Sequence, residues 1–67
     1  MSINPIKARR FITGKTQDDI FIETGIFPSK LSRLERGYLN PSTLSQSEKK
    51  KLAHALNTTV EKLFGGL

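Results

Sequence analysis

Residues 16–37 read TQDDIFIETGIFPSKLSRLERG, and this stretch predicts two short helices joined by a turn. Thr16 and Asp19 have the spacing of a capping box. In that motif the side chain of each residue accepts a hydrogen bond from the backbone N–H of the other, at the start of a helix. The first helix is therefore expected to begin at this point. It extends only to about residue 24, because Gly25 interrupts the pattern.

The second helix of the pair is expected over about residues 28–36. Pro28 suits the first helical position because its φ angle is preset. Leu31 and Leu34 share one face at a spacing of three residues, and Gly37 ends the helix. Helices this short are unstable in isolation, so the two must pack against each other.

The rest of the chain predicts three more helices. One is expected over about residues 5–13, where an asparagine cap precedes a proline. Ser45 and Glu48 repeat the capping-box spacing ahead of a fourth helix that ends near residue 57. A fifth covers about residues 60–64, and no run shows the alternation of a strand. The sequence therefore predicts a compact all-α fold of five short helices.

The composition is that of a small folded protein. The chain has 67 residues, which suffice for a single domain over residues 1–67. Hydrophobic residues make up 36% of it, which is typical of a globular protein rather than a disordered chain. The lack of cysteine excludes a disulfide framework and a thiolate zinc site. Because no apolar signal segment is recognised either, we expect a cytoplasmic protein with no membrane span.

The charge balance favours a polyanionic partner. The formal net charge is +5, which suits nucleic acid or an acidic membrane surface. Residues 1–17 contain Lys7, Arg9, Arg10 and Lys15 and no acidic residue. Basic side chains are thus concentrated just before the two central helices.

Catalytic chemistry has no supporting pattern. His54 is the only histidine, and a metal site or a catalytic base would need companions that the sequence lacks. Asp18 and Asp19 are explained by their place in the first turn of a helix, where the dipole favours negative charge. We therefore expect no enzyme, no metal site and no cofactor.

Two short helices joined by a glycine-containing turn can hold the second helix at the surface, ready to enter the major groove of DNA. Residues 16–37 closely resemble the helix-turn-helix of the Cro and phage-repressor-like proteins, the xenobiotic response element family. The resemblance covers roughly residues 6–64. It is carried by Thr16-Gln17-Asp18-Asp19-Ile20, Thr24-Gly25-Ile26, Leu31-Ser32-Arg33-Leu34-Glu35-Arg36-Gly37, Asn40-Pro41-Ser42, Lys51-Leu52-Ala53-His54-Ala55-Leu56 and Val60-Glu61-Lys62-Leu63-Phe64.

This resemblance implies a five-helix, lambda-repressor-like domain that binds duplex DNA sequence-specifically through its third helix. Such a domain is expected to regulate transcription, as a repressor, from an operator sequence. One copy reads only a short half-site, so the resemblance also implies a homodimer, at least on DNA.

The resemblance assigns roles to individual residues. Arg33 is expected to be the main base reader, because its planar fork matches the two acceptors of guanine, whereas Pro28 offers only apolar contact. Arg10 and Glu35 resemble a structural ion pair that ties the first helix to the third. The residues expected to read bases are Pro28, Ser29, Lys30, Ser32 and Arg33. The residues expected to contact phosphates are Lys15, Gln17, Arg36, Tyr38 and Asn40.

Two aromatic residues depart from the family pattern. Phe21 stands where the family prefers alanine, at a close approach of two helices, so either the helices are splayed or the ring turns outward. Phe27 stands where serine or threonine usually caps the third helix, which leaves the start of that helix unfixed.

These departures keep a second function open. The chain would then be a protein-interaction module or an antitoxin-like component, with DNA binding secondary and with Phe21, Phe27 and Phe64 at the contact. An exposed patch of Phe21 and Phe27 over the third helix favours this interpretation, and a buried Phe21 weakens it.

Overall fold

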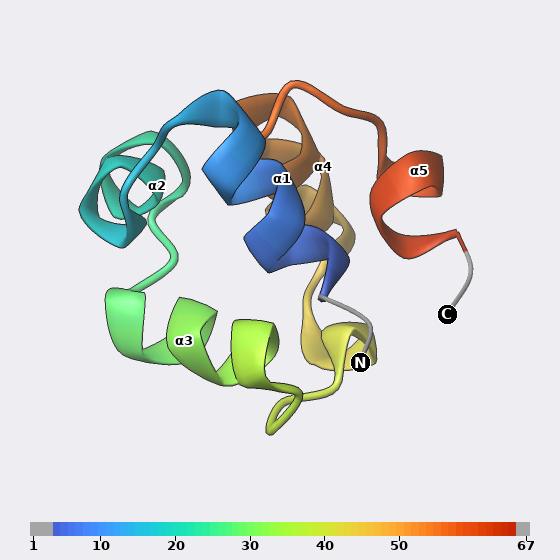
Figure 1. Ribbon diagram of the computed structural model, residues 1–67. Coiled ribbons are helices and arrows are strands. Elements are labelled where there is room, and N and C mark those ends of the chain that lie inside the picture. The colour runs from blue at the N-terminus through green and yellow to red at the C-terminus, as the bar shows by residue number, and fades with distance from the viewer. Residues whose placement is uncertain (1–3, 66–67) are drawn as a thin grey trace.

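The computed structural model describes residues 4–65, and all regular structure in that range is helical. Its α-helices are α1 (Pro5–Thr13), α2 (Gln17–Thr24), α3 (Pro28–Arg36), α4 (Gln46–Ala55) and α5 (Val60–Phe64), and a 3-10 turn, η1 (Pro41–Thr43), precedes α4 (Figure 1). The prediction of an all-α fold with five short helices is confirmed. The loop expected after the third helix contains η1, because a proline with its preset φ begins that turn.

Local signals in the sequence set the helix ends. The capping box of Thr16 and Asp19 is formed at the start of α2, and α4 begins with an equivalent box. Gly25 ends α2 with a φ of 78°, in the left-handed region that only glycine enters without steric cost. Phe27 gives α3 no side-chain cap, yet α3 begins at Pro28, whose ring presets φ and removes one N–H that would need a partner.

One hydrophobic core holds the helices together, and all five contribute to it. Its largest fully buried side chains are those of Ile20, Ile26, Leu31, Leu34, Leu52 and Leu56. α2 packs against both α3 and α4, while α1 packs against α3 and α5 against α4. Figure 1 shows α3 along one edge of the molecule, with the other helices to one side of it. The opposite side of α3 is therefore turned outward.

Candidate nucleic-acid interface

The outward face of α3 carries two arginines. Arg33 and Arg36 are exposed, whereas Leu31, Leu34 and Glu35 on the other side of the helix are buried. Neither guanidinium makes a hydrogen bond or an ion pair with another residue of the range 4–65. Both groups are therefore available to an anionic or hydrogen-bonding partner.

The N-terminal end of α3 is also accessible. Ser29 is exposed, and Pro28 and Ser32 are partly exposed. Because Phe27 supplies no cap, the N–H of Ser29 lacks the side-chain acceptor that most helix starts provide. This end of the helix offers hydroxyl and backbone donors beside the apolar ring of Pro28.

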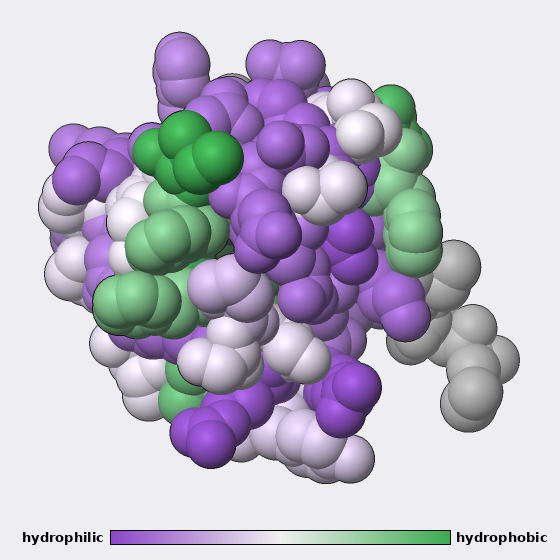
Figure 2. Space-filling view, turned by 90° about the vertical axis from the view of Figure 1, so that its left-hand side faces the viewer, coloured by the Kyte–Doolittle hydropathy of each residue, from purple (hydrophilic) through white to green (hydrophobic). Residues whose placement is uncertain are grey.

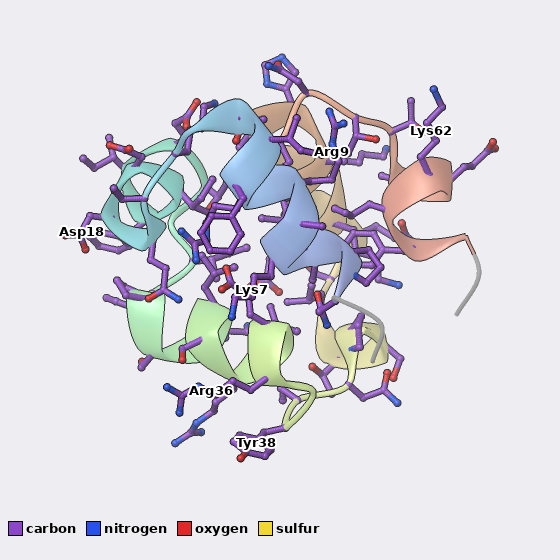
Figure 3. All side chains as sticks on the ribbon, viewed as in Figure 1. Lys7, Arg9, Asp18, Arg36, Tyr38 and Lys62 are labelled. Carbon is purple, nitrogen blue, oxygen red and sulfur yellow. The ribbon has the colours of Figure 1, made fainter. Side chains whose placement is uncertain are left out.

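The segment after α3 extends the same face. Figure 3 shows the side chains of Arg36 and Tyr38 pointing away from the body of the protein. Asn40 is exposed as well, and its Oδ1 accepts a hydrogen bond from the N–H of Ser42 at 2.9 Å. Asn40 therefore caps η1, and its amide nitrogen makes no hydrogen bond with the residues that the structure describes.

Lys30 lies on the flank of α3 rather than on its outward face. Its Nζ is 2.9 Å from Oε2 of Glu48, so the ammonium group is held against the start of α4. The resemblance predicts that Lys30 reads bases, and such a contact would require this partly exposed ion pair to open. The sequence carried no sign of the pairing, because the two residues are 18 positions apart.

Lys15 is engaged at the other end of α4. Its Nζ donates to the carbonyl oxygen of Ala55 at 2.6 Å and forms an ion pair with Glu23 at 2.9 Å. A lysine at this position satisfies a free carbonyl and complements the negative end of the helix dipole. The expected phosphate contact of Lys15 therefore competes with a structural role.

Arg10 and Glu35 form an ion pair between α1 and α3. Nε of Arg10 donates to Oε2 of Glu35 at 2.7 Å, and Nη2 donates to Oε1 at 3.0 Å. This hydrogen bonding to the carboxylate raises the pKa of Arg10 above its ordinary value. Gln17, at the first position of α2, lies beside the pair, with its Nε2 3.4 Å from Oε1 of Glu35. The geometry therefore fixes the start of α2 relative to α3.

Phe21 and Phe27 form a stacked pair on the surface. Their ring centroids are 5.0 Å apart with an angle of 24° between the planes. The exposed fractions are 36% for Phe21 and 62% for Phe27. Of the two arrangements that Phe21 allowed, the ring has turned outward, while α2 and α3 remain packed. Figure 2 shows a run of apolar surface on the side of the molecule formed by α2 and the start of α3.

Phe64 does not belong to this surface. It is 7% exposed and lies in the core at the end of α5. The sequence interpretation that placed it with Phe21 and Phe27 in a protein contact is therefore wrong. Its position follows from the shared apolar face of α5, which the core covers.

No protein-family model, curated protein or solved structure matches this chain. The resemblance to the Cro and phage-repressor-like proteins therefore stays a prediction carried by the residues themselves. Within residues 4–65, no helix has the length and apolar character needed to cross a membrane.

Proposed function

We propose that this protein binds duplex DNA sequence-specifically by placing α3 in the major groove, and that it regulates transcription as a repressor. The observation that carries the proposal is that the four arginines of the chain differ in their contacts. Arg9 is bound to the carbonyl oxygens of Leu56 and Asn57, and Arg10 is bound to Glu35. The other two lie unpaired on the outward face of α3 among the described residues.

In this proposal Arg33 reads bases and Arg36 holds the backbone. A guanidinium can donate two parallel hydrogen bonds to O6 and N7 of guanine, which no other base pair offers in the same pattern. Ser29 and Ser32 reach nearby base edges or phosphates, and Tyr38 contacts a phosphate from the loop.

The DNA target is proposed to be a two-fold operator bound by a homodimer. A helix as short as α3 reads only a few base pairs, so one copy gives low affinity. Two copies related by two-fold symmetry read half-sites about one helical turn apart. The proposed location is the cytoplasm, where a protein without cysteine needs no oxidising environment to fold.

The test is selection of binding sites from random duplex DNA, followed by affinity measurements with variants. Arg33→Ala is expected to lose the preference for one base pair in each half-site by about 1–3 kcal/mol, roughly five- to 150-fold. Lys62→Ala is the matched control, because it removes one positive charge from α5, on the opposite side of the molecule from Arg36 (Figure 3). Equal base preferences in the two variants would contradict the assignment.

A second candidate function is favoured by one observation, the exposed stack of Phe21 and Phe27. In that case the chain is a protein-interaction module or an antitoxin-like component. A selection that enriches no sequence, together with no duplex binding at low salt, would replace the first proposal with this one.

A further inference from the structure

The stacked pair of Phe21 and Phe27 lies at the N-terminal end of α3. Phe27 is the residue that directly precedes Pro28, the first residue of that helix. Phe21 comes from α2, and its ring stacks on Phe27 with centroids 5.0 Å apart. The ring of Phe27 is therefore supported from one side and remains 62% exposed.

Beside the hydroxyl of Ser29, this end of the helix carries two apolar side chains, those of Phe27 and Pro28. The side chains of Phe27 and Pro28 offer no hydrogen-bond donor or acceptor, so they cannot read the polar edges of the bases. The major groove presents one apolar group, the C5-methyl group of thymine, and phenylalanine is among the side chains that contact it. Because the ring is already held by Phe21, little conformational freedom is lost on contact.

The surroundings favour DNA over a protein as the occupant of this surface. The aromatic pair continues directly into α3, whose outward face holds the cations of Arg33 and Arg36, both without an ion pair within residues 4–65. An apolar protein partner would have to cover those charges or leave them beside the contact, whereas a DNA groove neutralises them with phosphates.

We infer that Phe27, supported by Phe21, is a specificity-determining residue that packs against the C5-methyl group of a thymine in each half-site. This inference rests on the proposed function, because it requires α3 to lie in the major groove. It assigns to the two aromatic residues that depart from the family pattern a preference for thymine at the base pair next to the N-terminal end of α3.

The experiment compares thymine with uracil in the duplex obtained by selection. Uracil keeps every hydrogen-bonding group of thymine and lacks only the methyl group. With the wild-type chain, each replacement is expected to weaken binding about fourfold, the factor that corresponds to burial of one methyl group, so one replacement in both half-sites should weaken binding of the dimer about 15-fold. In Phe27→Ala the affinities for the two duplexes should become equal, and in Phe21→Ala their ratio should fall.

Ile22→Ala is the matched control. Ile22 is an exposed apolar residue next to Phe21, but its side chain takes no part in the stack. This variant should keep the wild-type ratio of thymine to uracil affinity. Thermal unfolding of each variant, followed by circular dichroism, separates loss of folding from loss of contact.

The outcomes distinguish the inferred thymine contact of Phe27 from the proposed DNA-binding function. Sequence-specific binding in which every thymine can be replaced by uracil without effect would overturn the inference and leave the proposed function standing. A ratio that Phe27→Ala leaves unchanged would also overturn it. Failure to bind any duplex would reject the proposed function and the inference together.

Discussion

The most consequential single contact is the one between Arg10 and Glu35. Glu35 is only 8% exposed, and both of its carboxylate oxygens accept hydrogen bonds from the guanidinium. Nη1 of Arg10 also donates to the carbonyl oxygen of Lys15 at 3.2 Å, so one side chain links α1, α3 and the loop before α2. A buried pair adds little net stability, but the loss of one partner leaves a charge without compensation.

Arg10→Met is therefore expected to lower the free energy of unfolding by about 3–5 kcal/mol, a large part of the stability of so small a domain. Urea denaturation followed by circular dichroism measures the loss. Lys7→Met removes a charge from the exposed side of the same helix and should change the stability little. Adding Glu35→Leu to Arg10→Met should restore most of the stability, and a double variant no more stable than the single one would contradict the explanation.

At the scale of elements, the starts of α2 and α4 depend on ionised carboxylates. In the capping box of α4, the N–H of Glu48 donates to the hydroxyl of Ser45, and the Glu48 carboxylate accepts from the N–H of Ser45. This hydrogen bond from the Ser45 backbone and the contact with Lys30 lower the pKa of Glu48. The backbone hydrogen bond of Thr16 likewise lowers the pKa of Asp19 at the start of α2.

A pKa that is lower in the folded state than in the unfolded chain makes stability depend on pH. The contribution is complete above the unfolded pKa of about 4 and is lost as the pH falls through the lower folded value. For this reason we expect the melting temperature to decrease as the pH is lowered below about 4.5. In Glu48→Gln the amide still accepts the capping hydrogen bond, so this variant should show a smaller fall.

The control for this pH effect is Glu61→Gln. Glu61 is exposed, and its side chain makes no hydrogen bond or ion pair with the residues of the range 4–65. The experiment is a series of thermal unfolding curves between about pH 3 and pH 7, a range that includes the ordinary pKa values of carboxyl groups. If Glu48→Gln and Glu61→Gln gave the same slope as the wild type, the capping explanation would be wrong.

At the scale of the whole molecule, the basic side chains fall into two groups, those bound to other groups of the chain and those with no hydrogen bond or ion pair among residues 4–65. Arg9, Arg10, Lys15 and Lys30 are bound to carbonyl oxygens or carboxylates of the same chain. Arg33 and Arg36 on α3 have no such partner among residues 4–65, and neither do the lysines at positions 7, 49, 50, 51 and 62, so α3 carries only part of the charge that the proposed DNA contact could use. The molecule spans only 26 Å in its longest direction, so one copy covers a short piece of duplex.

Two copies are accordingly expected on one operator, with half-sites about 34–36 Å apart. Insertion of about five base pairs between the half-sites turns them to opposite sides of the duplex and should abolish tight binding of two copies. Sedimentation of the complex measures the number of copies bound. A duplex with a single half-site is the control and should bind one copy more weakly, so equal affinity for half and complete sites would contradict the homodimer.

The helix bounds were predictable because their causes are local. The capping boxes, the prolines at first helical positions and the glycines after α1, α2 and α3 act on residues within one turn. The apolar spacing within each helix likewise identified Leu31, Leu34 and Leu52 as core residues before any packing was known. The outward face of α3 followed from the same spacing.

The sequence by itself thus determined the helices, their ends and the residues that face the core. Only the tertiary structure decided what the charged and aromatic side chains do, because their partners lie far away along the chain. Lys15 contacts Ala55, 40 positions away, and Lys30 contacts Glu48, 18 positions away. The outward turn of Phe21 depends on Phe27 across the turn between two helices. Residues 16–37 form the helices of the proposed interface, and long-range packing determined which of its side chains remain available to bind a partner.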